Sequence, residues 1–113
     1  RALAARYDAL LADAGLGMPH ESPDRTPVYH LYVVRTPQRD ALRAHLKANG
    51  VEAGIHYPIP LHVQPAMSYL GYAPGAFPHA EAAGREVLSL PLYAEMTEVQ
   101  QDHVAAAIRQ FKG

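Results

Sequence analysis

The sequence predicts an α/β (α+β) domain in which helices cover a small three-stranded sheet, mixed or antiparallel. Apolar residues recur at helical spacing near both ends of the chain. Residues 28–35, VYHLYVVR, are instead rich in the β-branched and aromatic types that favour strands. The chain has 113 residues, of which 49% are hydrophobic, so one domain with one core is expected.

Helices and strands are expected to alternate in the first half of the chain. Apolar positions at helical spacing predict a helix over residues 1–14, ended by Gly15. The stretch 15–27 contains Gly, Pro, Ser and Asp and is expected to be a surface loop before the strand over residues 28–35. A capping residue followed by proline then predicts a second helix over residues 37–49.

Arg39, Arg43 and Lys47 form a basic stripe on this second expected helix. Their four-residue spacing places them on one helix face, where such residues form either an anion site or a solvated stripe. The solvated stripe is the commoner arrangement and is the one expected here.

The second half of the chain is expected to contain shorter elements separated by prolines. Each proline within residues 56–62 pushes the preceding residue out of the helical region, so this segment is expected to be extended and stiff. Thr97 and Gln100 have the spacing of a capping box and predict a final amphipathic helix. The remaining expected elements are a strand over 51–55, a short helix over 65–70 ended by Gly71, a helix over 78–87 and a strand over 88–90.

The composition disfavours several classes of function. With 10 Lys and Arg against 11 Asp and Glu, the formal net charge is −1, which gives no footprint for nucleic acid. No apolar run approaches the roughly 20 residues that cross a bilayer, and no signal peptide pattern opens the chain, so a cytoplasmic protein is expected. The absence of cysteine removes disulfides and thiolate chemistry.

The segment IHYPIPLH, residues 55–62, is the candidate binding site. Its two prolines fix the backbone in advance, so little further conformational entropy is lost when a ligand binds. The candidate binding residues are His56, Tyr57 and His62, whose imidazole and phenol groups can donate hydrogen bonds to, or accept them from, sugar hydroxyls or phosphate oxygens. Structural alternatives remain: His56 as a strand-end histidine bonded to a carbonyl, and Tyr57 as an aromatic that fills an interface.

No catalytic, cofactor-binding or metal-binding residue is expected within the chain itself. Lys47 belongs to the basic stripe and Lys112 lies near the C-terminus, so neither has the desolvated setting that a Schiff-base lysine needs. His56 and His62 are six residues apart with no third ligand nearby, which is weak support for a metal site. The serines lack the motif of a nucleophile elbow.

Four sequence blocks occur in a characteristic order between residues 28 and 111. The motifs HYP, PLH, FPxAE and LSLPLY follow one another within them, and this succession resembles the C-terminal small domain of the DegT/StrS-type (fold-type I) sugar aminotransferase family. The blocks are YHLYVVR with RDALRAHL, GVEAGIHYPIPLHVQP, GYAPGAFPHAEAAGREVLSLPLY and the helix that follows Thr97.

The resemblance implies a pyridoxal-phosphate-dependent enzyme that moves an amino group from glutamate or glutamine to a nucleotide-linked keto-sugar. In this family the cofactor lysine belongs to a large N-terminal domain, so residues 15–113 would form the small domain and residues 1–14 the end of the inter-domain helix. His56 and Tyr57, with His62 as a further candidate, would line the sugar side of the cleft. The resemblance also implies a homodimer, with no pyridoxal phosphate bound to this chain alone.

Two rival interpretations remain open. A domain of the same fold whose parent has lost the lysine would serve only in binding or dimerisation. An independent ferredoxin-like domain would instead sense a ligand. Arg1 opens directly into the first expected helix without a methionine or a capping residue, which indicates a fragment of a longer protein.

Overall fold

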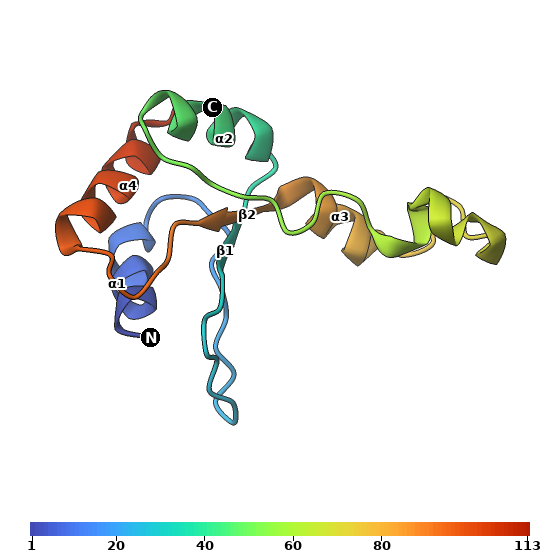
Figure 1. Cartoon of the computed structure of the whole chain (residues 1–113), viewed down its shortest axis with the longest axis horizontal. Helices are drawn as coiled ribbons and strands as arrows, with labels where there is room; N and C mark the ends of the chain where they lie inside the picture. The colour runs from blue at the N-terminus through green and yellow to red at the C-terminus, as the bar shows by residue number, and fades with distance from the viewer.

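The computed structural model describes residues 1–113 and contains a two-stranded antiparallel sheet with helices packed on it. Helices α1, α2 and α4 gather at one end of the molecule, whereas α3 and two short 3-10 helices extend away from it (Figure 1). In chain order the elements are α1 (Ala2–Leu11), β1 (Tyr32–Arg35), α2 (Arg39–Ala48), η1 (Leu61–Val63), η2 (Pro65–Leu70), α3 (Pro78–Glu86), β2 (Val87–Leu90) and α4 (Glu98–Gln110). The expected α/β class with a small antiparallel sheet is confirmed.

The sheet has two faces of different character. β1 and β2 pair with Tyr32 opposite Leu90 and Val34 opposite Leu88, and all four side chains belong to the buried core. Because successive side chains of a strand point to opposite faces, Ser89 points away from these core residues. We call the face that carries Ser89 the second face of the sheet.

The third strand expected over residues 51–55 is reduced to a single bridge between Gly54 and Ser89. The next hydrogen-bonded pair before Gly54 would require an N–H group from Pro91, which proline lacks, so the ladder ends there. The sheet is therefore antiparallel, which is one of the two expected arrangements, but it has two strands rather than three.

The first strand is shorter than the sequence predicts. It begins at Tyr32 rather than at Val28, because Tyr29 has a φ of 53°, in the left-handed region that interrupts an extended strand. β2 also offers only four residues for pairing. The residues before Tyr32 instead belong to a narrow loop that projects from the sheet (Figure 1).

Helix α1 is an integral part of the hydrophobic core. Ala4, Tyr7 and Leu11 occupy one helix face and are fully buried. The helix ends at Leu11, earlier than the expected end at residue 14, and Gly15 follows with a φ of 74°. The positive φ explains why glycine occupies this position after the helix.

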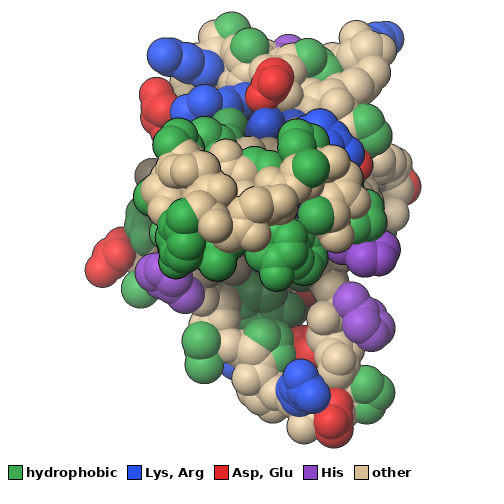
Figure 2. Space-filling model, turned by 90° about the vertical axis from the view of Figure 1, so that its right-hand side faces the viewer, with side chains coloured by type: hydrophobic (Ala, Val, Ile, Leu, Met, Phe, Trp, Pro, Cys, Tyr) green, Lys and Arg blue, Asp and Glu red, His purple; other side chains and the backbone are tan.

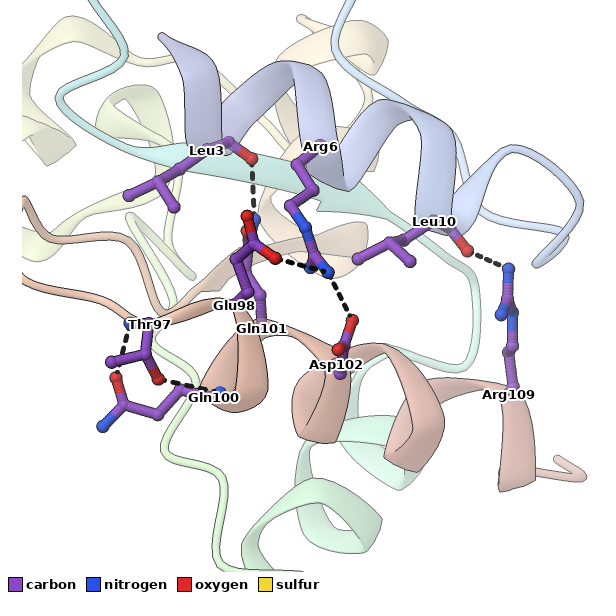
Figure 3. A network of polar contacts seen from close by, with 9 residues as sticks. All are labelled: Leu3, Arg6, Leu10, Thr97, Glu98, Gln100, Gln101, Asp102 and Arg109. Atoms are coloured by element: carbon purple, nitrogen blue, oxygen red, sulfur yellow. Dashed lines mark hydrogen bonds and ion pairs between the residues drawn. The ribbon is translucent and has the colours of Figure 1, made fainter.

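An ion pair and a hydrogen bond connect α1 to α4, as Figure 3 shows. The guanidinium of Arg6 lies 2.8 Å from the carboxylate of Asp102, and the amide of Gln101 donates a 2.7 Å hydrogen bond to the carbonyl of Leu3. The expected capping box is confirmed at the start of α4, where Thr97 and Gln100 bond to each other's backbone N–H groups. The two terminal helices therefore belong to one packed unit.

Residues 57–86 form an extension that we call the arm. The Cα radius of gyration is 15.6 Å, larger than the about 13 Å typical of a compact domain of 100 residues, because the arm does not fold back on the core. Seven of the eleven large hydrophobic side chains that are exposed lie on the arm. The seven side chains are those of Tyr57, Ile59, Leu61, Tyr69, Leu70, Tyr72 and Phe77. Figure 2 looks onto the end of the arm and shows hydrophobic side chains gathered there.

None of the helices combines the length and the apolar character that a membrane crossing requires.

Candidate functional site

The proline-containing segment after Gly54 is held at the base of the arm by a close contact with α3. A Cβ atom on Gly84 would lie 2.8 Å from the carbonyl oxygen of Pro58 and 3.2 Å from Cδ of Pro60. Any larger residue in this turn of α3 would push the segment away. Pro60 itself has an extended backbone, with φ −58° and ψ 147°, as expected. The expectation for residues 56–62 is wrong at its end, because residues 61 and 62 belong to the 3-10 helix η1.

Arg39 also stabilises this region. The expectation that Arg39 belongs to a solvated stripe is wrong. Its side chain is buried, and Nη1 donates hydrogen bonds to the carbonyl oxygens of Gly84 at 3.0 Å and Val87 at 3.1 Å. These carbonyls belong to the end of α3 and the start of β2, where backbone acceptors lack partners within the helix. Arg39 thereby fixes the junction between the arm and the sheet.

The rest of the basic stripe is balanced by acidic residues. Arg43 and Lys47 line a hollow of about 400 Å³ together with Asp40 and Glu52. Two positive and two negative side chains leave no net positive charge, so the hollow gives no support for an anion site.

His56 lies on the second face of the sheet. Its Nδ1 is 2.9 Å from Oγ of Ser89. A Cβ atom on Gly54 would lie only 2.8 Å from Cε1 of His56, so the imidazole ring covers the glycine. His56 is nevertheless exposed as a residue, and Nε2 makes no hydrogen bond within the chain.

Tyr57 stands beside His56 at the start of the arm. Its side chain is 75% exposed, and its ring meets the imidazole edge to face with centroids 5.5 Å apart. The peptide bond between the two residues is cis. The structure therefore brings the first two candidate residues together and leaves the phenol hydroxyl without a partner in the chain.

His62 lies in a different environment from His56 and Tyr57. Only 8% of its side chain is exposed, and its ring packs edge to face against Phe77 with centroids 4.9 Å apart. Its Nε2 is 3.4 Å from Oε2 of Glu81, an ion-pair distance at which no well-aligned hydrogen bond forms. Within this chain the partners of His62 are thus residues of the arm itself.

Glu81 closes the turn that precedes α3. Its carboxylate accepts hydrogen bonds from the N–H groups of Gly75, at 2.7 and 2.9 Å, and Phe77, at 3.2 Å. The N–H of Gly75 contributes most to a lowered pKa of the Glu81 carboxyl, and Phe77 and His62 act in the same direction. Glu81 lies within the helix expected over residues 78–87, and the sequence gave no sign of its bonds to the loop before that helix.

Sequence reasoning also missed three residues that shape the site. Ser89 lies in the strand expected over residues 88–90, but its bond to His56 depends on the Gly54 bridge, which the sequence did not indicate. Gly54 and Gly84 were not singled out, although an isolated glycine in a strand or helix is a signal of close approach.

The exposed groups of this site are suited to binding a polar ligand. The side chains at its surface are an imidazole and a phenol, which donate and accept hydrogen bonds. Within the chain, no group of three or more His, Asp or Glu side chains is placed to hold a metal ion. Neither lysine adjoins β2: Lys47 lies on α2 and Lys112 follows α4.

The sequence profile of the DegT/DnrJ/EryC1/StrS aminotransferase family matches residues 1–109. A dTDP-3-amino-3,4,6-trideoxy-alpha-D-glucose transaminase of Streptomyces venezuelae is 46% identical over 113 residues, which covers 97% of this chain and 29% of that protein. A pleiotropic regulatory protein of Geobacillus stearothermophilus is 43% identical over 111 residues, which covers 96% of this chain and 30% of that protein.

The fold of the chain also matches solved structures. The crystal structure of Streptomyces venezuelae DesV in complex with a ketimine intermediate superposes with a TM-score of 0.93 and 44% identity, over 96% of this chain and 30% of that one. The chain therefore spans only about 30% of the length of the proteins that it resembles.

Proposed function

The chain belongs to the DegT/DnrJ/EryC1/StrS aminotransferase family, and we propose from this that it is the C-terminal small domain of a pyridoxal-phosphate-dependent sugar aminotransferase. The intact enzyme would transfer an amino group from glutamate or glutamine to a nucleotide-linked keto-sugar. The name of the relative from Streptomyces venezuelae, a transaminase of a dTDP-linked amino sugar, supports this substrate class.

The observation that carries the proposal is the position of His56 and Tyr57. Both side chains lie at the base of the arm, away from the helical core, and Nε2 of His56 and the hydroxyl of Tyr57 have no partner within the chain. Polar groups that a folded domain orients but does not pair are available to a ligand. In our proposal they contact the sugar or phosphate oxygens of the substrate.

His62 was a further candidate for substrate binding. Its burial against Phe77 and its proximity to Glu81 favour a structural role in the arm. We therefore assign the direct substrate contacts to His56 and Tyr57 and keep His62 as a residue that shapes the arm.

The apolar surface of the arm supports a larger partner. Single exposed apolar side chains are ordinary, but seven on one extension form a patch of the kind that marks an interface. We propose that the large domain of the same protein and a second subunit cover the arm, so that the intact enzyme is a homodimer. Residues 1–14 would then be the end of the inter-domain helix and residues 15–113 the small domain, joined through the core contacts of α1.

The cofactor would be held by the part of the enzyme that this chain does not cover. Lys47 lines a hollow on α2 beside acidic residues and Lys112 follows the last helix, so neither fits covalent attachment of pyridoxal phosphate at the His56 surface. The cofactor supplies the electron sink for amino transfer, and this chain supplies one wall that orients the sugar. We place the intact enzyme in the cytoplasm, as expected from the sequence.

An assay of the intact enzyme tests this proposal. With added pyridoxal phosphate, the full-length protein is expected to transfer the amino group of glutamate or glutamine to a nucleotide-linked keto-sugar, whereas the 113-residue chain alone is expected to be inactive. Spectroscopic evidence that the full-length protein binds no pyridoxal phosphate would contradict the proposal.

A second candidate is a catalytically silent domain that serves in binding or dimerisation. The relative from Geobacillus stearothermophilus is named a pleiotropic regulatory protein, and this name supports the second candidate. The sequence of the large domain distinguishes the two, because only the enzyme needs a lysine that reaches the cofactor.

A further inference from the structure

We propose that Ser89 is a positioning residue that orients His56 and selects its tautomer, so that Nε2–H is presented to an oxygen acceptor of the substrate. The inference deepens the proposed function and rests on it for the identity of that acceptor. The orientation of His56 itself rests only on contacts within this chain.

The backbone places Ser89 and His56 on the same side of the sheet. Gly54 and Ser89 exchange two backbone hydrogen bonds, of 2.7 and 3.0 Å, so their side-chain positions face the same way. His56 follows Gly54 by two residues and therefore points to that face as well. The Ser89 hydroxyl then lies within hydrogen-bond reach of the imidazole, with Oγ 2.9 Å from Nδ1.

The glycine at position 54 completes the arrangement. Its φ is not in the left-handed region, so the backbone itself does not require glycine there. The requirement is steric, because a Cβ atom would come within 2.8 Å of Cε1 and 3.5 Å of Nδ1 of the imidazole. The hydrogen bond to Ser89 thus orients the imidazole ring, and the absence of a side chain at Gly54 leaves room for it.

The direction of the hydrogen bond between Ser89 and His56 follows from the acceptors available to the serine hydroxyl. Ser89 is only 5% exposed, and its hydroxyl has no acceptor in the chain other than Nδ1 of His56. If Nδ1 carried the proton, the O–H of Ser89 would be buried without an acceptor, which is unfavourable. The arrangement that satisfies both groups has Ser89 donating to Nδ1.

This tautomer determines what His56 offers to a ligand. A neutral imidazole carries one proton, so a lone pair on Nδ1 leaves the proton on Nε2. Nε2 then acts as a donor, and its partner must be an acceptor such as a phosphate, hydroxyl or carbonyl oxygen. The pairing resembles the way in which a bond to one ring nitrogen fixes the function of the other in many histidine sites.

Nitrogen NMR of the intact enzyme, labelled with ¹⁵N-histidine and recorded at alkaline pH, tests the positioning directly. The His56 signals, assigned with His56→Gln, are expected to show a bare Nδ1 and a protonated Nε2. Ser89→Ala should produce a mixture of tautomers, and Ser89→Thr, which retains the hydroxyl, should restore the single form. A protonated Nδ1 in the wild type, or an unchanged tautomer in Ser89→Ala, would overturn the inference.

Kinetics separate this inference from the proposed function. In the intact enzyme, Ser89→Ala and Gly54→Ala are expected to raise KM for the nucleotide sugar about five-fold, with kcat nearly unchanged. Leu88→Val weakens the same strand from the opposite, core face of the sheet and should leave KM unchanged. If the tautomer depends on Ser89 but KM does not change, the positioning is upheld and His56 is rejected as a substrate contact. An equal rise of KM in Leu88→Val would instead assign the effect to strand stability and overturn the positioning.

Discussion

The hydroxyl of Tyr7 in α1 donates a 2.7 Å hydrogen bond to the carbonyl oxygen of Pro91, which follows β2. The ring of Tyr7 packs against Tyr32 of β1 with centroids 5.0 Å apart. One buried side chain therefore joins the first helix to β1 and to the residue that follows β2, across 84 residues of sequence. The contact explains how α1 can be part of the core although it lies at the start of the chain.

Replacing Tyr7 with Phe is expected to lower the free energy of unfolding by about 1–2 kcal/mol. The change removes the hydrogen bond and leaves the Pro91 carbonyl without this partner, while the apolar packing of the ring is kept. Urea unfolding followed by circular dichroism measures the effect. Tyr69→Phe, at a position that is 79% exposed, is the matched control and should change stability little.

Stability is expected to fall at alkaline pH. Burial raises the pKa of Tyr7, and burial together with the hydrogen bond to Asp8 raises the pKa of Tyr32. Both phenols stay protonated in the folded state at a pH where the unfolded chain ionises them, so their stabilisation is complete below about pH 10 and is lost as the pH rises toward the raised values. Unfolding of the Tyr7→Phe variant should depend less steeply on pH above that point, and an unchanged slope would contradict this reasoning.

Gly84→Ala tests the contact between α3 and the proline segment. In an open helix this substitution stabilises by up to about 1 kcal/mol, because glycine is a poor helix former. Here the new methyl group would meet the Pro58 carbonyl at 2.8 Å, so a net loss of about 1–3 kcal/mol is expected. Ala82→Gly in the same helix provides the reference for propensity alone. A gain in stability for Gly84→Ala would show that the segment moves freely.

The turn before α3 is expected to loosen in acid. The lowered pKa of Glu81 means that its bonds to Gly75 and Phe77 are complete above about pH 4.3, the ordinary value, and are lost only as the pH falls through the lower folded-state pKa. The amide proton shift of Gly75 should therefore titrate below the ordinary range. Glu81→Gln should abolish the titration, whereas Glu95→Gln, at an exposed position without such bonds, should not.

Much of the local structure was predictable because its determinants are local. The Thr97 capping box, the glycines after α1 and η2 and the prolines after Gly54 each act within a few residues, and these features appear where expected. The length of β1 and the loss of the third strand were not predictable, because they depend on Pro91 and on the conformation of Tyr29.

The candidate site was predictable in its residues but not in its geometry. The segment that contains His56 and Tyr57 stood out through its prolines and aromatic groups. The burial of Arg39 and the bond between His56 and Ser89 arise from residues that lie 33 or more positions apart, and no periodicity in the sequence reports such contacts. Only the fold brings these groups together.

The most direct test of the account is the affinity of the intact enzyme for its nucleotide sugar, measured by calorimetry for four proteins. Relative to the wild type, His56→Ala and Tyr57→Phe are each expected to weaken binding by about five-fold, as for the loss of one hydrogen bond. Tyr69→Phe, the same change farther along the arm, is expected to bind like the wild type. Equal affinities for all four proteins would contradict the claim that the base of the arm forms one wall of the substrate site.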